Sequence, residues 1–119
     1  MIRLYKLFTV ICILESGMNT VVVNMKSGAM GPAQITQGVL DDVNPIHGET
    51  WKLHQLRRMD TSFCVFRLYL TRYKRLTRGQ GLVTEAEALG IIRAWRNGPF
   101  AVEDRYPDYT QRAMNLLRR

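Results

Sequence analysis

The stretch "LFTVICILESG", residues 7–17, decides how the N-terminal part of this chain folds. Its residues are apolar almost without interruption from Leu7 to Leu14, which predicts a buried helix over residues 2–15. Gly17 follows and suits the left-handed conformation that ends many helices. A single carboxylate, Glu15, is therefore expected at the end of an apolar helix.

Two effects act on the pKa of a glutamate in that position. The unpaired carbonyl groups of the last helical turn carry partial negative charge, which disfavours ionisation. The apolar flank disfavours it further by desolvation. Both raise the pKa, as a general acid near neutral pH requires. Taken alone, an exposed glutamate without a function is the alternative.

Composition limits the kind of protein. A chain of 119 residues with 46% hydrophobic residues suits one domain around one core. Its 17 basic and 10 acidic residues give a net charge of +7, which favours a polyanionic partner. Nucleic acid, an anionic membrane surface and a carboxylate-bearing cell-wall polymer all meet that condition.

The residues that usually bind metals are scattered. Cys12 and Cys64 each lie in an apolar, helical-looking segment, which favours two buried thiols and leaves a disulfide as the alternative. His47 and His54 stand alone, and the chain has no Cys-x-x-Cys pair. We therefore expect neither a metal site nor a cofactor.

The basic and apolar N-terminus superficially resembles a secretory signal. Its apolar stretch is at the short end for such a signal, and no cleavage site of the Ala-x-Ala kind follows it. The stretch is also too short to span a bilayer. We expect the first helix of the fold here, with no signal peptide and no membrane span.

The rest of the chain predicts a mainly α fold with at most a small β element. The sequence of residues 49–58 favours neither a helix nor a strand. The Thr84–Glu87 pair forms a capping-box pattern, and Pro107 suits the first turn of a helix. The predicted elements are a short strand or extended segment at 20–24, a glycine-bearing loop at 26–32, and helices at 33–43 (ending before Pro45), 61–77, 84–97 and 107–117.

Four short segments occur in a recognisable order. They are "ESG" at 15–17, "SGAMGPAQIT" at 27–36, "AWRNGP" at 94–99 and a late tyrosine in "YPDYTQRAMNLL". This order and spacing resemble the soluble lytic transglycosylase family, which shares the lysozyme-like fold of goose-type lysozymes. The resemblance spans nearly the whole chain, and "GPAQITQGVLDDVN" is most similar to bacteriophage virion-associated members.

The resemblance implies a peptidoglycan-cleaving enzyme with Glu15 as its one catalytic acid and base. The implied partners are peptidoglycan glycan strands and other virion proteins, with no specific nucleic acid. The implied location is the virion, acting in the bacterial periplasm or cell wall. The residues implied to bind substrate are Ser16, Gly28, Met30, Gly31, Gln34, Trp95, Asn97 and Tyr109.

The chain departs from the family pattern at several positions. Arg96 stands where the family usually has asparagine, and Asn97 comes one place later. Pro32 and Ala33 replace the usual Leu-Met pair, and Trp95 lacks the hydroxyl of a tyrosine. These departures affect substrate contacts and leave the acid in place.

The residues also have simpler interpretations. Gly28 and Gly31 suit tight turns and the close approach of a ligand, and a plain turn is the alternative. Gln34 is expected to hold a sugar N-acetyl group or to orient the acid, unless it is only an early helical residue. Trp95 and Tyr109 are expected either to stack on sugars or to pack in the core.

The number of carboxylates separates the possible reactions. Most glycosidases use two, whereas the family pattern assigns both proton transfers to one glutamate. Asp41 and Asp42 are candidates for a second acid, although solvated or capping positions suit them better. The alternatives are a muramidase using Glu15 with Asp41 or Asp42, a non-catalytic lysozyme-like virion protein, and a basic helical nucleic-acid binder.

Overall fold

The computed structural model describes residues 1–119 and is mainly α-helical, as predicted. A two-stranded antiparallel sheet is its only β-ladder. The elements are β1 (Ile2–Arg3), α1 (Leu4–Ser16), α2 (Gln37–His47), the 3₁₀ helix η1 (Leu53–Arg57), α3 (Met59–Arg72), β2 (Leu82–Val83), α4 (Glu85–Asn97) and α5 (Pro107–Leu117).

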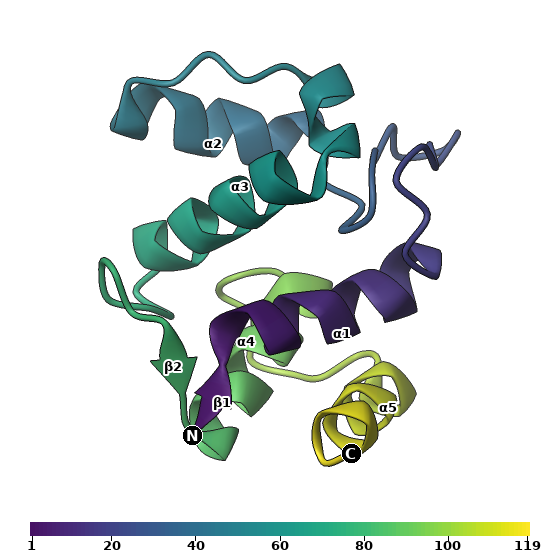
Figure 1. Ribbon diagram of the computed structural model, residues 1–119, viewed down its shortest axis with the longest axis vertical. Coiled ribbons are helices and arrows are strands. Elements are labelled where there is room, and N and C mark those ends of the chain that lie inside the picture. The colour runs from purple at the N-terminus through teal and green to yellow at the C-terminus, as the bar shows by residue number, and fades with distance from the viewer.

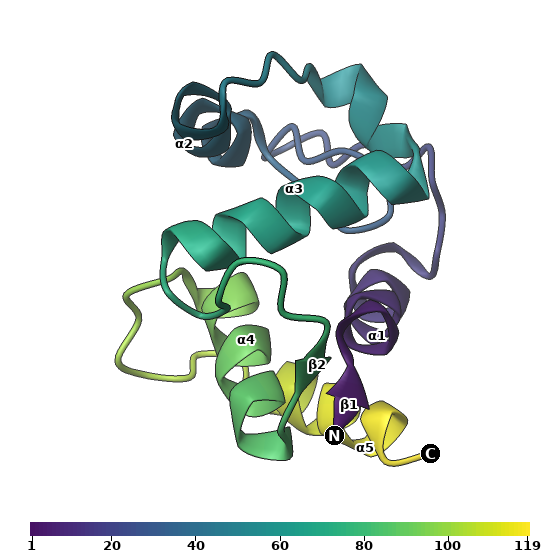
Figure 2. The same cartoon turned by 60° about the vertical axis from the view of Figure 1, so that its left-hand side comes forward.

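Helix α3 runs through the middle of the molecule. Figures 1 and 2 show α2 and the segment before α3 on one side of it, and α1, α4, α5 and the small sheet on the other. One core joins both sides, because it contains Leu40 of α2 together with Phe8 of α1. The buried Phe66 of α3 lies within it and contacts Phe8 and Trp95 of α4, with ring centroids 5.1 and 5.0 Å apart.

The first helix begins later than predicted. Ile2 and Arg3 are extended and pair with Val83 and Leu82, and the Leu4 amide donates to the Gly81 carbonyl at 2.9 Å. The sequence gives no sign of this pairing, because its partner lies about eighty residues away. Helix α1 ends as predicted, with Gly17 at a φ of 65° and its amide donating to the Ile13 carbonyl at 2.9 Å.

The segment between α1 and α2 crosses the surface without regular structure. Residues 20–24 form no strand of a ladder, and single bridges join Val23 to Met30 and Met30 to Ile35. The predicted loop at 26–32 is confirmed. Buried Ala33 and Ile35 anchor the segment to the core.

The prediction for 33–43 is wrong at both ends. Gln34 has a φ of 55°, which is incompatible with a helix, and Thr36 caps α2 by accepting from the Val39 amide at 3.4 Å. The helix then continues through Pro45 to His47. Pro45 removes only the hydrogen bond to the carbonyl of Asp41, and water can satisfy that carbonyl because Asp41 is exposed. The helix ends two residues later at His47, and Gly48 caps it.

Helix α3 also differs from its predicted range of 61–77. It begins at Met59 and ends at Arg72, because the backbone turns sharply at Lys74, whose φ is 60°. The apolar spacing continues past the end of the helix, since Leu76 is buried from the following loop. The periodicity therefore identified the buried face and overestimated the length of the helix.

The last two helices are confirmed. In the capping box of α4, the Glu87 amide donates to the Thr84 hydroxyl oxygen at 3.0 Å and the Thr84 amide donates to the Glu87 carboxylate at 2.9 Å. Gly98 follows the last residue of α4, and Pro107 opens α5.

The two cysteines are free thiols in different environments. Cys12 is buried, and desolvation raises the pKa of its thiol to about 12. Cys64 is exposed, so the prediction of two buried thiols is wrong for it. It lies on the side of α3 that the amphipathic pattern leaves outside the core.

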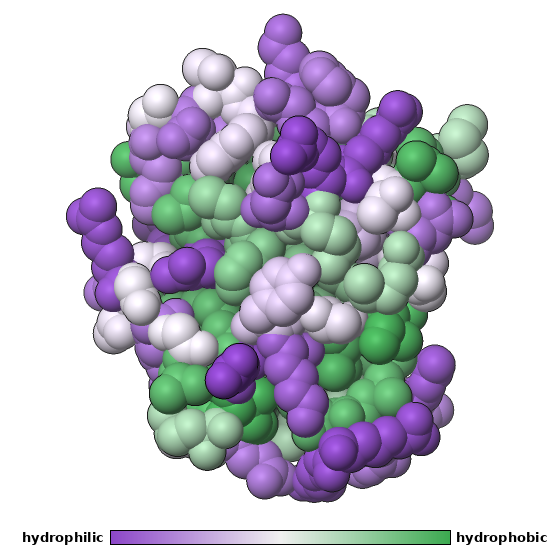
Figure 3. Space-filling model, in the orientation of Figure 1, coloured by the Kyte–Doolittle hydropathy of each residue, from purple (hydrophilic) through white to green (hydrophobic).

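The surface mixes apolar and polar side chains. On the face in Figure 3, apolar groups gather towards the middle, with hydrophilic groups at the upper and lower ends. None of the helices combines the length and hydropathy needed to cross a membrane.

Candidate active site

Glu15 lies in the last turn of α1, where the elements of one side of the molecule meet the loop that leads to α2. Its side chain is only 11% exposed. Tyr109 of α5 and Arg96 of α4 both contact its carboxylate. The first helix and the last two helices of the chain therefore meet at this one acid.

The two oxygen atoms of Glu15 have different partners. The Tyr109 hydroxyl donates to Oε2 at 2.7 Å. Oε1 lies 3.9 Å from the Arg96 guanidinium, which is longer than the separation of about 2.8 Å in a charge-assisted hydrogen bond. Oε1 is therefore the oxygen free to carry an acid proton.

Desolvation dominates the ionisation of Glu15. Burial raises the pKa of the carboxyl above its usual value, while the Tyr109 hydrogen bond and the Arg96 charge oppose that rise. The net shift is upward, as the position at an apolar helix end predicted. The Tyr109 hydroxyl cannot compete as a proton donor, because burial and the adjacent carboxylate raise its pKa far above the usual value.

A cavity of about 280 Å³ opens beside this carboxylate. It lies between the loop that precedes α2 and the C-terminal part of α4, and most of its lining groups are polar. Glu15 is its only carboxylate. The lining residues are Glu15, Asn24, Ser27, Ala29, Gln34, Thr36, Val39, Tyr69, Trp95 and Arg96.

Gln34 lies in the cavity wall and makes no hydrogen bond to Glu15. Its side-chain amide donates to the carbonyls of Gly31 at 3.0 Å and Val22 at 3.3 Å. Both amide hydrogens thus hold the loop, and the amide oxygen is left to accept from a ligand. The interpretation of Gln34 as an early helical residue is wrong, because it precedes α2 and has a positive φ.

Ser16 connects helix α1 to the same loop. Its hydroxyl donates to the Pro32 carbonyl at 2.7 Å and lies 3.2 Å from the Cys12 carbonyl. Ser16 is not among the residues that line the cavity. The geometry gives it a positioning role, since it fixes the loop against the helix end that carries Glu15.

Gly28, Met30 and Gly31 belong to the loop but do not line the cavity, although their neighbours Ser27 and Ala29 do. Gly31 has a φ of 83° and faces Leu56, so close that an added Cβ would lie 2.0 Å from the Leu56 carbonyl oxygen. Met30 bridges Val23 and Ile35.

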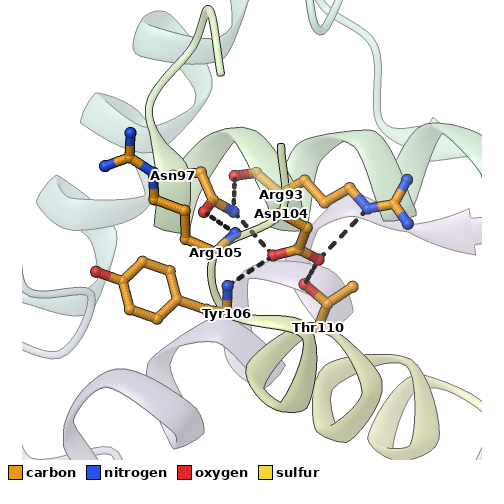
Figure 4. Close-up of polar contacts among 6 residues, drawn as sticks. All are labelled: Arg93, Asn97, Asp104, Arg105, Tyr106 and Thr110. Atoms are coloured by element: carbon orange, nitrogen blue, oxygen red, sulfur yellow. Dashed lines mark hydrogen bonds and ion pairs between the residues drawn. The ribbon is translucent and has the colours of Figure 1, made fainter. Parts of the chain in front are cut away.

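Trp95 and Asn97 lie two residues apart in α4 and have different surroundings. Trp95 lines the cavity and also packs edge-on against Phe66 and Tyr69. The Asn97 amide instead donates to the Arg93 carbonyl at 3.0 Å and to Asp104 at 3.1 Å, and it accepts from the Arg105 amide at 2.8 Å. Figure 4 shows this network, which ties the end of α4 to the loop between α4 and α5, and Asn97 is not among the residues that line the cavity.

The residue beside the acid is therefore Arg96 and not Asn97. In the sequence Arg96 stands out only as a departure from the family pattern, and no local feature indicates that its guanidinium approaches Glu15. Its charge lies 4.3 Å from the centre of the Tyr106 ring and 5.4 Å from that of Tyr109. Asn24, Ser27 and Tyr69 are further lining residues that the sequence did not indicate.

Neither candidate second acid lies in this cavity. Asp41 is exposed and accepts from the Gln37 side chain at 2.9 Å, one turn away on α2. Asp42 accepts a hydrogen bond from the Tyr73 hydroxyl. Their contacts are those of surface and helix-packing residues.

A larger hollow of about 650 Å³ lies elsewhere, between α3, the end of α2 and the loop at Arg78. Asp60 is the only carboxylate in its lining, and Arg58 pairs with that residue at 3.0 Å. It therefore offers no protonated acid, and the smaller cavity is the better candidate for acid–base chemistry.

Removal of the Tyr109 hydroxyl tests the origin of the Glu15 pKa. Because the hydrogen bond stabilises the carboxylate, Tyr109→Phe should move the pKa of Glu15 further upward, as carbon NMR of the labelled carboxyl would measure. Tyr5→Phe, at an exposed tyrosine of α1, is the matched control. A downward shift in Tyr109→Phe would contradict the assigned hydrogen bond.

No family model, curated protein or solved structure matches this chain. The site is therefore defined by its own geometry: one nearly buried glutamate with a raised pKa, in a polar cavity that contains no second carboxylate.

Proposed function

We propose that the protein is a peptidoglycan lytic transglycosylase that uses Glu15 as its only acid and base. The observation that carries this proposal is the isolation of Glu15, whose pKa burial raises and whose cavity holds no other carboxylate. A hydrolase of the usual kind needs a second carboxylate beside the first. A transglycosylase does not, because a hydroxyl of the substrate takes the place of water.

The reaction has two proton transfers through the same residue. Protonated Glu15 donates from Oε1 to the glycosidic oxygen between N-acetylmuramic acid and N-acetylglucosamine, and the bond from C1 to that oxygen breaks. The resulting carboxylate removes the proton of the muramoyl C6 hydroxyl, whose oxygen bonds to C1. The product carries a 1,6-anhydro ring, water is not consumed, and Glu15 ends protonated again.

The other lining groups suit a sugar ligand. Trp95 offers an aromatic surface, and the free oxygen of the Gln34 amide can accept from an N-acetyl N–H. The net charge of +7 favours association with the anionic wall. Local wall degradation by a phage particle remains part of the proposal and rests on the resemblance of the four segments.

Clearing of a purified peptidoglycan suspension tests the proposal against a nucleic-acid function. We expect turbidity to fall with time and no salt-sensitive shift of DNA at the same protein concentration. A DNA shift without clearing would favour the basic binder, and the absence of both would favour a non-catalytic protein.

Replacement of both aspartates of α2 tests the muramidase alternative. Because Asp41 and Asp42 lie outside the cavity, the variant carrying Asp41→Asn and Asp42→Asn should keep at least about half of the clearing rate and yield the same product. Circular dichroism controls for loss of fold. A folded double variant that has lost activity would favour hydrolysis with a second carboxylate.

A further inference from the structure

The Glu15 oxygen that is available for the acid proton is the one that faces Arg96. Oε2 accepts from Tyr109, so the acid proton belongs on Oε1, the oxygen that faces the guanidinium at 3.9 Å. A positive charge beside that oxygen favours the carboxylate and opposes its protonation. Arg96 therefore lies where its charge opposes protonation of the acid.

The Arg96 side chain has the freedom to leave this position. It is 40% exposed and lies in the last turn of α4, and its contact with Glu15 is longer than a charge-assisted hydrogen bond. Its other neighbours are the faces of Tyr106 and Tyr109, which hold a guanidinium without fixing its direction. Rotation of side-chain bonds alone can turn it towards the cavity, which it already lines.

The surrounding backbone is held firmly enough that only the side chain needs to move. Asn97 and Asp104 tie the end of α4 to the following loop, and the Thr110 hydroxyl donates to Asp104 at 2.7 Å (Figure 4). The Tyr106 amide donates to the same carboxylate at 3.0 Å. The aromatic surface below Arg96 is thus fixed relative to α4 and α5.

We propose that Arg96 binds a carboxylate of the muramoyl residue, and that this exchange of partners frees Oε1 of Glu15 for its proton. The inference rests on the proposed function. An arginine fork suits a carboxylate in two-point geometry, and the cavity offers it no acid other than Glu15. Binding of the substrate would thereby favour the protonated form of Glu15, the acid that cleaves it.

Few charged groups other than Arg96 are placed to change the protonation of Glu15. Besides burial, the groups that act on the pKa of Glu15 are Arg96 from α4 and Tyr109 from α5. Cys12, on the same helix as Glu15, is itself affected, because the Glu15 charge adds to the rise in the pKa of its thiol. Tyr69 of α3 lines the same cavity, and burial raises the pKa of its phenol to about 12. The lining residues from the loop before α2 are uncharged, so Arg96 is the one cation whose departure alters the acid.

Two sources can supply the carboxylate, and the substrate arms distinguish them. One is the lactyl group of glycan strands freed of peptide, and the other is the peptide stem of intact strands. Each kind of strand is compared with its carbodiimide-amidated form, in which the carboxylates have become neutral amides. If amidation of one kind of strand slows the wild-type enzyme, the carboxylate of that kind of strand is the one that Arg96 binds.

We expect amidation of that strand to lower kcat/KM of the wild type about tenfold or more, the size of one hydrogen-bonded ion pair. Arg96→Gln should lose about the same factor on the acidic strand and respond little to amidation. Arg96→Lys keeps the charge without the fork and should retain part of the response. Arg112→Gln, at an exposed arginine of α5, is the control for net charge.

The pH profiles provide a readout that a structural role would not change. Activity should fall as pH rises through the pKa of Glu15, because the reaction begins with the protonated acid. In the wild type this pKa should be higher in the profile of kcat, which reports the substrate complex, than in that of kcat/KM, which reports the free enzyme. In Arg96→Gln the two values should coincide.

Equal cleavage of acidic and amidated strands by the wild type would overturn the inference while leaving the proposed function intact. An equal response to amidation in wild type and Arg96→Gln would also overturn it. Failure of the wild type to cleave any strand would instead refute the proposed function, and with it the role of Arg96. Arg96→Lys replaces Arg96→Gln in the comparison if the latter does not fold.

Discussion

Glu15→Gln is expected to reduce wall cleavage at least about 100-fold, and to background if the glutamate works alone. Glutamine fills nearly the same space, and its amide oxygen can still accept from Tyr109, but it cannot donate a carboxyl proton. Clearing of purified peptidoglycan measures the loss. Glu49→Gln, at an exposed glutamate, removes the same charge and should leave the rate unchanged.

The same substitution should not weaken the fold. Burial raises the pKa of Glu15 above its unfolded value, so the folded state binds the proton more tightly and loses stability as pH rises through that range. The neutral glutamine removes this penalty at pH 7. The thermal midpoint of Glu15→Gln should therefore equal or exceed that of the wild type, and wild-type clearing by the folded variant would refute the assignment.

Gly31→Ala is expected to be the most destabilising single methyl addition in the loop before α2. A Cβ there would lie 2.0 Å from the Leu56 carbonyl oxygen and 2.8 Å from its carbon, and the φ of 83° disfavours any L-residue. Backbone strain and overpacking together predict a loss of about 2–5 kcal/mol in the free energy of unfolding. Denaturant titration measures it.

Gly28→Ala is the matched control for Gly31→Ala. Its φ of 73° imposes a similar backbone strain, but no atom lies within 4 Å of the added methyl. The expected loss is about 1–2 kcal/mol, from strain alone. Equal losses in the two variants would show that contact with Leu56 is not what makes Gly31 necessary.

Local sequence signals predicted the elements whose ends are set locally. The capping pair Thr84 and Glu87 marked the start of α4, Pro107 marked that of α5, and Gly17 marked the end of α1. Such ends depend on residues within one turn of the chain. The periodic apolar pattern likewise indicated the buried face of α3.

The sequence did not predict the features that depend on contacts between residues far apart in the chain. The β1–β2 pairing joins residues 2–3 to residues 82–83, with α1, α2, η1 and α3 between them in the sequence. Gln34 adopts a positive φ in a loop that its side chain holds by donating to the carbonyls of Gly31 and Val22. Arg96 was visible only as an unusual residue. Its approach to Glu15 depends on how α1 and α4 are both placed by packing against α5, which local features of the sequence do not reveal.

Mass spectrometry of muropeptides from digested sacculi tests the central claim most directly, because it reports activity and reaction type together. If Glu15 acts alone, the products should end in 1,6-anhydro-muramic acid and be lighter by one water than reducing-end products. Reducing-end muramic acid from the wild type would contradict the single-carboxylate mechanism, even with Glu15 as the acid.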